Sequence, residues 1–262
     1  MDSYYPRRSD CLGNGVSKRQ SPNEAQPIVQ KLRLRYSKSG RMRFASHRDF
    51  QRALERAVRR AELPIAFSGG FSPHPRISYA NAAPTGAASE AEYVQLGMRQ
   101  EIDAQLVPDA LTAALPAGFA ITQCVVSTSG SVADRLEASL WQLEVRGVSE
   151  EHVTAALNRL EATPDVAVER VTKSGVKQVE VGSAMLESAV TTAESVVGSE
   201  PCAILRVVVR HDTPAVRPED VLTALVEYAD LDEPVSSVFT RLAQGPLMGN
   251  PVAVGDPFSE AL

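Results

Sequence analysis

The first element of the fold is indicated by an alternating stretch near the N-terminus, Lys31-Leu32-Arg33-Leu34-Arg35-Tyr36. Its apolar residues recur at every second position, which is typical of a strand with one buried face. A turn over residues 37–40 follows. Ser46, with Asp49 three residues later, then predicts the N-terminal cap of a helix over residues 47–61. The folded part of the chain is therefore predicted to begin with a strand and a helix.

Residues 77–127 extend this beginning to a β-α-β-β-α-β order. Two strands are predicted over residues 77–81 and 93–98. A helix over residues 102–115, which ends at a Pro-Ala-Gly stop, precedes a further strand over residues 120–127.

A second series with the same order follows a polar linker at residues 128–138. Its predicted elements are a strand over 141–145, a helix from Ser149 to about 162, a hairpin over 166–181, a strand over 203–209, a helix over 218–228 and a strand over 235–241. Two such series predict an α+β fold of two tandem ferredoxin-like (βαββαβ) units with antiparallel sheets. The alternative is one unit with a less regular α+β domain, because residues 165–200 define no clear element.

Composition divides the chain into four segments. Residues 1–27 are rich in Ser, Pro, Arg, Asn and Gly without apolar periodicity, which predicts a disordered leader. The N-terminal, basic unit is placed at residues 28–127 and the C-terminal, acidic unit at residues 138–245. Residues 246–262, which are rich in Gly and Pro, predict a flexible tail.

Charge is distributed unevenly along the 262 residues. The net charge is −5, yet residues 30–76 hold 12 basic and 3 acidic side chains, whereas residues 77–262 carry a net charge of −15. The acidic total argues against a general nucleic-acid coat protein. The basic block indicates where a polyanion would bind.

Several function classes have no support in the sequence. The cysteines Cys11, Cys124 and Cys202 are far apart, so neither a disulfide framework nor a cysteine-ligated metal cluster is predicted. P-loop, dinucleotide, zinc-protease and serine-hydrolase motifs do not occur, nor does an apolar run of about 18 residues that would cross a membrane. We therefore expect a cytoplasmic protein with no cofactor, no metal and no membrane partner.

Arginine is the main residue type of the basic block. The predicted helix contributes Arg48, Arg52, Arg56, Arg59 and Arg60, whose spacing places them along one side. The strand and its turn contribute Arg33, Arg35, Arg41 and Arg43, together with Lys31 and Lys38. We expect strand and helix to be adjacent and these cations to form one surface. Because guanidinium groups bind phosphate oxygens bidentately, the surface predicts RNA binding. The alternative is a solvated helix in which Glu55 pairs with Arg59.

A second candidate is the loop that follows the helix, Ser68-Gly69-Gly70-Phe71-Ser72-Pro73-His74-Pro75-Arg76. Paired glycines allow backbone N–H groups to approach an anion closely, and the two prolines restrain the backbone around His74. We interpret the loop as a recognition element for a base or a phosphate. The alternative is a packed crossover in which Phe71 fills the core.

Two histidines form a third candidate. His47 begins the predicted helix and His74 lies in the loop. Imidazole transfers protons near neutral pH, so one histidine could act as base and the other as acid in RNA cleavage without a metal. They could equally donate hydrogen bonds to phosphate. No third positioning group is visible, and Asp49 and Glu62 are the only carboxylates nearby, so neither catalysis nor a metal site is favoured.

One family resemblance rests on these same residues. It begins at Ser46-His47-Arg48-Asp49 and continues through Arg59-Arg60-Ala61-Glu62-Leu63-Pro64 to Gly70-Phe71-Ser72-Pro73-His74-Pro75. Pro84-Thr85-Gly86 and Ser89-Glu90-Ala91-Glu92-Tyr93 extend it. The pattern resembles the bacterial radical SAM-linked, or radical SAM-associated, family. The resemblance implies a domain fused to or encoded beside cobalamin-binding radical SAM proteins, and it supplies no catalytic residues. The chain lacks the C-x-x-x-C-x-x-C motif of a radical SAM enzyme, so it is at most the partner domain.

These observations lead to one favoured hypothesis. We expect a non-catalytic accessory protein that binds RNA or a ribonucleoprotein through its basic N-terminal face and holds it for a radical SAM protein. Two alternatives stay open. One is a metal-independent endoribonuclease that uses His47 and His74, and the other is an interaction module whose basic face docks an acidic protein.

Overall fold

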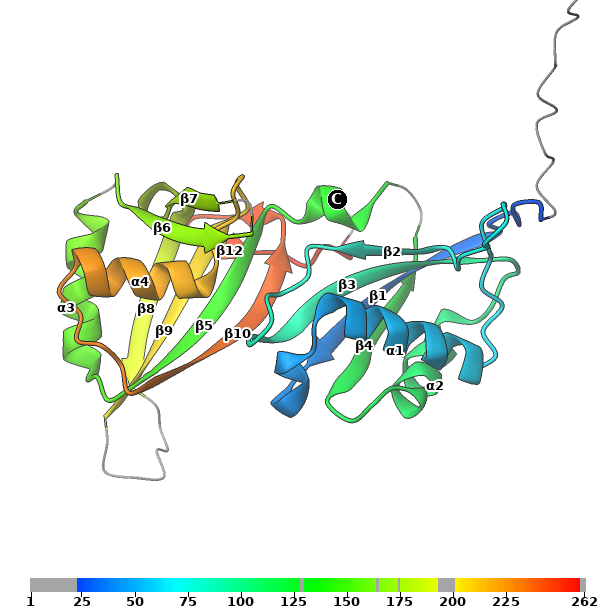
Figure 1. Ribbon diagram of the computed structural model, residues 1–262, viewed down its shortest axis with the longest axis horizontal. Coiled ribbons are helices and arrows are strands. Elements are labelled where there is room, and N and C mark those ends of the chain that lie inside the picture. Colours follow the sequence, from blue (N-terminus) through cyan, green and yellow to red (C-terminus); the bar gives the residue numbers. More distant parts are fainter. Residues whose placement is uncertain (1–22, 128–129, 164, 174, 193–200, 260–262) are drawn as a thin grey trace, which may run out of the picture.

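The computed structural model describes residues 23–127, 130–163, 165–173, 175–192 and 201–259. It shows a mixed α+β fold whose large sheet has the strand order β4-β1-β3-β10-β5-β9-β8, with β2 paired to β3 (Figure 1). In the described part of the chain, no helix is long and apolar enough to cross a membrane.

The N-terminal half has the predicted order of elements. These are β1 (Gln30–Lys38), α1 (His47–Arg60), β2 (Ile77–Ala80), β3 (Ala88–Met98), α2 (Val107–Ala114) and β4 (Phe119–Val126). The cap of α1 is as predicted. The Ser46 hydroxyl accepts a hydrogen bond from the Asp49 N–H, and the Asp49 carboxylate accepts one from the Ser46 N–H.

The alternation of β1 decides which side of the sheet is covered. Leu32, Leu34 and Tyr36 are buried in the core beneath α1, where the rings of Tyr36 and Phe50 stack with centroids 3.9 Å apart. Successive side chains of a strand point to opposite faces, so the arginines of β1 lie on the other side of the sheet.

The C-terminal half contains one strand that the sequence did not predict. Its elements are β5 (Ala138–Arg146), α3 (Glu150–Glu161), β6 (Ala167–Thr172), β7 (Gly175–Glu180), β8 (Met185–Thr192), β9 (Cys202–Arg210), α4 (Pro218–Tyr228) and β10 (Ser236–Gly245). The β6–β7 hairpin is confirmed, but it forms a small sheet of its own. The unpredicted β8 is an edge strand without a fully buried residue, so it lacks a clear apolar alternation.

The two halves share one sheet, whereas the sequence predicts two separate antiparallel sheets. Thr240 and Arg241 of β10 pair in parallel with Ala88 and Ser89 of β3. This pairing exists because β3 begins at Ala88, well before the start predicted at Tyr93. The prediction of an α+β protein is confirmed, and two separate units are not.

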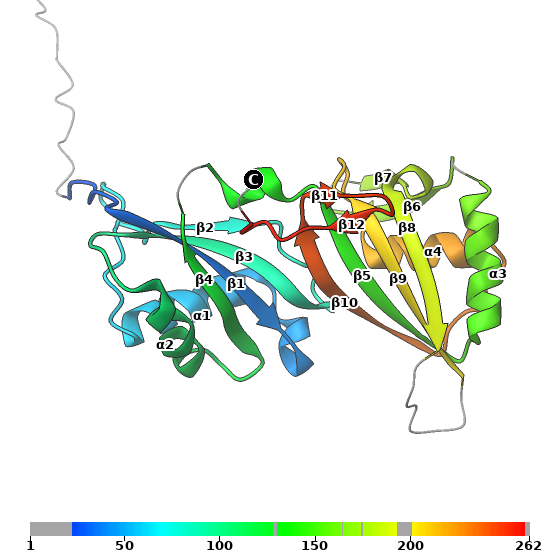
Figure 2. The same ribbon diagram turned by 180° about the vertical axis from the view of Figure 1, so that it is seen from behind.

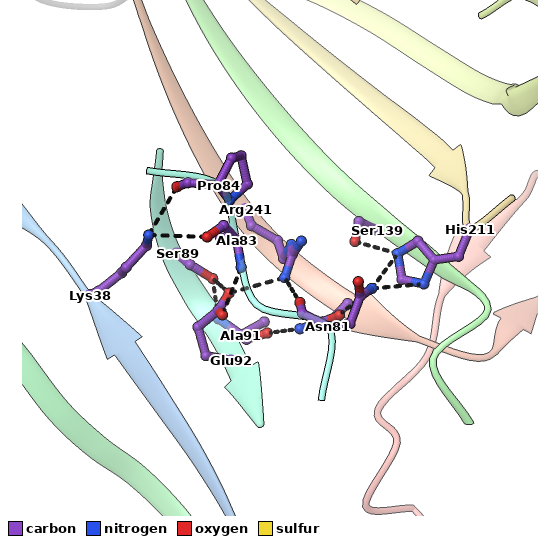
Figure 3. Close-up of polar contacts among 11 residues, drawn as sticks. Lys38, Asn81, Ala83, Pro84, Ser89, Ala91, Glu92, Ser139, His211 and Arg241 are labelled. Atoms are coloured by element: carbon purple, nitrogen blue, oxygen red, sulfur yellow. Dashed lines mark hydrogen bonds and ion pairs between the residues drawn. The ribbon is translucent and has the colours of Figure 1, made fainter. Parts of the chain in front are cut away.

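A buried polar cluster occupies the junction between β3 and β10 (Figure 3). Glu92 is 1% exposed and Arg241 is 4% exposed, and their ion pair is 3.0 Å long. Glu92 also accepts hydrogen bonds from the Ser89 hydroxyl and the Ala83 N–H. Lys38 donates to the carbonyl of Pro84, and burial lowers the pKa of its ammonium group. Charges that are buried this deeply require partners, and the partners here come from both halves.

The C-terminal segment packs against the N-terminal half, contrary to the flexible tail predicted for residues 246–262. Short strands β11 (Leu247–Met248) and β12 (Ala253–Val254) pair with each other. Asp256 then forms a 2.6 Å ion pair with Arg35, and the Phe258 ring packs on Tyr93. Figure 2 shows the segment on the face of the sheet opposite α1 and α4. Residues 260–262 lie outside the described part.

We predict that Arg241→Ala lowers the free energy of unfolding by about 3 kcal/mol, because it leaves Glu92 buried without its ion-pair partner. The value lies at the low end for a broken buried pair because Lys38 stays near Glu92. Urea denaturation followed by circular dichroism measures the change. Arg146→Ala is the control, since Arg146 is exposed, Glu144 is half-buried, and their pair of 3.6 Å lies near the surface and should contribute less than about 1 kcal/mol. Equal effects of the two substitutions would contradict the structural role of Arg241.

Candidate nucleic-acid interface

The arginines of α1 form a continuous exposed row. All five, Arg48, Arg52, Arg56, Arg59 and Arg60, are solvent-exposed. The opposite side of the helix buries Phe50, Ala53, Leu54, Ala57 and Val58. None of the ion pairs seen among the described residues involves this row. The guanidinium groups of the row are therefore available for an external anion, apart from Arg60, which donates to the Ala114 carbonyl.

The turn before α1 adds an aromatic side chain that sequence reasoning missed. Phe44, in the 3-10 turn Gly40–Phe44, is 60% exposed, and the Arg43 guanidinium lies 4.7 Å from its ring centroid. Arg41 in the same turn is also exposed. An exposed ring beside arginines is a surface on which an unpaired base can stack. An aromatic residue within a basic turn was the signal in the sequence.

The cations of β1 do not join this row, so the expected single surface is wrong. Arg33 is only 7% exposed, and its Nη2 donates to the Gly130 carbonyl. Arg35 binds Asp256 and the Tyr93 hydroxyl. Both lie on the face of the sheet opposite α1 because they alternate with Leu34. Lys38 is buried at the junction of the halves.

The paired glycines of the loop bind the chain's own N-terminal segment. The Gly70 N–H donates to the carbonyl of Asn23, and the Asn23 amide donates to the carbonyl of Gly70. A Cβ on Gly69 would lie 2.9 Å from the Ala25 nitrogen. Residues 23–26 are thus held against the loop. The prediction of a disordered leader over residues 1–27 is therefore wrong for these four residues. Residues 1–22 lie outside the described part.

The second half of the loop is presented to solvent. Phe71 is 68% exposed, so the alternative in which it fills the core is wrong. The Ser68 hydroxyl accepts a hydrogen bond from the His74 N–H, which holds the loop closed. His74 and Arg76 line a groove of about 390 Å³ together with Lys31 and Gln95. This groove is cationic, and it is separate from the α1 row.

The two histidines lie in different surroundings. His47 packs edge-on against the Tyr79 ring, at a centroid distance of 5.0 Å, and its Nε2 lies 3.0 Å from the Gln51 amide nitrogen. Tyr79 contacts the core beneath α1. His74, by contrast, lines the groove with Gln95, whose side chain alternates with the core residue Leu96 and so points to the other face. The structure does not bring the two imidazoles together.

The described residues form neither a metal site nor a reactive thiol. No group of three or more His, Cys, Asp or Glu residues there could hold a metal ion. Burial raises the pKa of the Cys124 thiol to about 12 and also raises that of Cys202. Both therefore carry the neutral thiol near pH 7, as expected for core residues. Cys11 lies outside the described residues.

Comparison with known proteins places the chain in a family. A family model described as "Uncharacterized protein conserved in bacteria (DUF2344)" matches residues 31–218. The chain belongs to this family. The DUF2344 match runs from β1 to the first residue of α4 and contains the arginine row, the loop and Glu92. It establishes a conserved bacterial family, and the finer resemblance to the radical SAM-linked family stays a prediction.

The remaining comparisons add no functional information. No curated protein matches the chain. Among solved structures, one described as a crystal structure of an unknown protein from Galdieria sulphuraria matches with 16% identity. The match covers 81% of this chain and 96% of the Galdieria sulphuraria chain, with a TM-score of 0.22. A likeness at this level supports no conclusion about fold or function.

We predict that Gly69→Ala releases residues 23–26 from the loop, because the added Cβ meets the backbone nitrogen of Ala25. Amide hydrogen exchange at Gly70 should then accelerate by about tenfold or more, which corresponds to a local loss of about 1.4 kcal/mol. Ser72→Ala, an exposed position of the same loop, is the control and should leave this rate unchanged. Unchanged exchange in Gly69→Ala would show that the segment does not depend on the close approach.

Proposed function

We propose that this protein binds RNA, free or within a ribonucleoprotein, through the exposed side of α1 and the turn before it. We call this surface the arginine face, and it consists of Arg41, Arg43, Phe44, Arg48, Arg52, Arg56, Arg59 and Arg60. The observation that carries the proposal is the row of exposed guanidinium groups on α1, which form none of the ion pairs seen among the described residues, in a chain whose net charge is −5. Such a row matches the repeated phosphates of a nucleic-acid strand.

The exposed Phe44 favours single-stranded RNA over an acidic protein. An acidic protein surface needs only cations, whereas an unpaired base also offers a flat face for stacking. Arg43 already lies over the Phe44 ring, so a base on this ring would be close to a guanidinium group. The acidic remainder of the chain would repel polyanions elsewhere and confine binding to the arginine face.

Contacts within the chain already occupy the face of the N-terminal sheet that lies opposite α1. Some RNA-binding proteins with four-stranded sheets stack bases on the open sheet face. Here that face carries the Arg35–Asp256 ion pair, and Phe258 packs on Tyr93. Val132 and Leu136 of the linker pack beside the same tyrosine. Binding is therefore proposed for the helix side.

We further propose that the two halves are ferredoxin-like units that share one sheet. Within the N-terminal half the strands are ordered β4-β1-β3-β2, and within the C-terminal half β10-β5-β9-β8. If the β6–β7 hairpin is treated as an insertion, each half follows the order fourth, first, third and second strand. This agreement is what supports a tandem origin of the two halves.

The accessory role is also a proposal. We infer that a radical SAM protein is the partner, and the support is the resemblance of residues 46–93 alone. No observation favours the ribonuclease alternative, since His47 and His74 face different surroundings. The protein would accordingly hold RNA for an enzyme rather than cleave it.

A triple substitution tests the arginine face. Arg48→Ala, Arg52→Ala and Arg56→Ala together should weaken binding of a mixed-sequence single-stranded RNA by about tenfold or more at about 50 mM salt. The slope of log affinity against log salt should fall by about 2, since each lost phosphate contact on a single strand removes about 0.7. Fluorescence anisotropy across a salt series measures both.

The matched control removes three exposed cations from the other half, by Lys173→Ala, Lys177→Ala and Arg210→Ala. This control removes three positive charges, as the arginine-face variant does. It should leave the RNA affinity and its salt dependence close to those of the wild type. RNA binding that is absent at about 50 mM salt would overturn the proposal. So would equal losses in the two triple variants, because the effect would then follow net charge alone.

A pull-down from the source cell separates an RNA ligand from an acidic protein. We predict that RNA is recovered with the tagged wild-type chain and lost when Arg52 and Arg56 are both replaced by Glu, because charge reversal repels phosphate. Mass spectrometry and RNA gels of nuclease-treated and untreated samples give the measurement. A protein that stays bound after nuclease treatment, but is lost on charge reversal, would favour the interaction module. Recovery of a radical SAM protein would identify the proposed partner.

A further inference from the structure

A small cavity lies where the two halves meet on the side of α1 and α4. It has a volume of about 180 Å³, and its wall includes Asn81, Ser139, Trp141, His211, Arg217 and Arg241. Asn81 follows β2, and Arg217 precedes α4, so each half contributes to the wall. The cavity is smaller than the roughly 300–1,000 Å³ of pockets for drug-sized ligands, and it would fit a single small group.

Arg241 is the buried charge in this wall. Its Nη1 donates to Glu92 and to the Asn81 carbonyl, and its guanidinium lies 4.7 Å from the Trp141 ring centroid. These contacts hold the planar group in one orientation. Its Nε is buried and has no hydrogen-bond partner in the described part of the chain. Nη1 therefore makes the hydrogen bonds that position the guanidinium, whereas the N–H group at Nε is not used as a donor.

His211 is held as a neutral group beside the arginine. Its Nδ1 lies 2.8 Å from the Leu136 carbonyl, which can only accept, so Nδ1 carries the proton. Its Nε2 then accepts a hydrogen bond from the Ser139 hydroxyl, at 2.7 Å. Burial lowers the pKa of His211, which also favours the neutral ring. Figure 3 shows the Asn81 amide between this ring and the Arg241 side.

The charged side chains that line the cavity are both cations. They are Arg217 and Arg241, and no carboxylate is among the lining residues. Arg241 is paired with Glu92, which lies outside the lining. Asp212 also lies outside the lining, although its charge acts on His211. Arg217 forms none of the ion pairs seen among the described residues, and an anion in the cavity would balance its charge.

We propose that this cavity binds one phosphate-type oxyanion, with Arg241 in the cavity wall and Arg217 as a second cation. Charge-assisted hydrogen bonds from guanidinium groups suit such an anion. The anion would come from inorganic phosphate or from the terminal phosphate of a bound RNA. The proposal stands independently of the arginine face, because none of the cavity residues belongs to that surface.

Inorganic phosphate is the first probe. Isothermal titration and thermal unfolding of the full chain, at constant ionic strength against chloride, should show saturable binding and a rise in Tm. Asn81→Asp places a carboxylate in the cavity without changing side-chain size, and Arg217→Ala removes an exposed cation. Each should weaken phosphate binding by about tenfold or more. Tm in chloride should stay near that of the wild type for Arg217→Ala. Asn81→Asp loses the hydrogen bond from Asn81 to the buried Gln244, so its rise in Tm with phosphate is measured against its own Tm in chloride. Arg210→Ala removes an exposed arginine that alternates with the lining residue Val209 and so points to the other face of β9, and it should bind phosphate as the wild type does.

A pair of RNAs that differ only in a 5′-phosphate or a 5′-hydroxyl distinguishes the two sources. Tighter binding of the phosphorylated RNA that disappears in Asn81→Asp would assign the cavity to the RNA terminus. Equal binding of both RNAs, with saturable binding of inorganic phosphate, would assign it to the free anion. The proposal is overturned if neither probe responds, or if Arg210→Ala reduces phosphate binding as much as Arg217→Ala. Loss of RNA binding in the arginine-face variant, with phosphate binding intact, would separate the two proposals.

Discussion

The ion pair between Glu92 and Arg241 holds the two halves of this protein in one sheet. A buried pair of this kind contributes little net stability compared with an apolar pair of the same size. An arrangement that separated the two charges, however, would leave each of them buried without a partner and would be strongly destabilised. Arg241 also binds the carbonyl of Asn81, and Glu92 binds the backbone of Ala83. The pair therefore specifies the register of β3 against β10 and the path of the chain after β2. A shift of one of the two strands by one residue would put the two charges on opposite faces of the sheet.

A single continuous sheet divides the charges of the chain between two sides. Leu32, Leu34 and Tyr36 turn toward α1, and Arg33 and Arg35 turn away to meet Gly130 and Asp256. The arginines of α1 point outward from the first side, because the opposite side of the helix is buried. The strand arginines are thereby used for internal contacts between distant segments. The helix arginines are left for an external ligand.

Local sequence was sufficient where neighbouring residues decide the structure. The capping box of Ser46 and Asp49, the alternation of β1 and the β6–β7 hairpin all depend on contacts within a few residues, and each was predictable. Prediction failed where residues far away in the sequence determine the local structure. The edge strand β8 is held by pairing to β9, and the C-terminal segment by Arg35 and Tyr93. Neither shows a local pattern, since the stabilising contacts lie far away in the chain.

The candidate sites divide in the same way. By itself, the sequence determined that a net positive block lies at residues 30–76 and that its helix carries arginines along one side, because helical spacing is a local property. Only the tertiary structure decided which cations reach solvent, that residues 23–26 occupy the paired glycines, and that Arg217, Arg241 and His211 share a cavity. Those outcomes depend on strand pairing across the junction of the halves, and this pairing leaves no periodicity in the sequence.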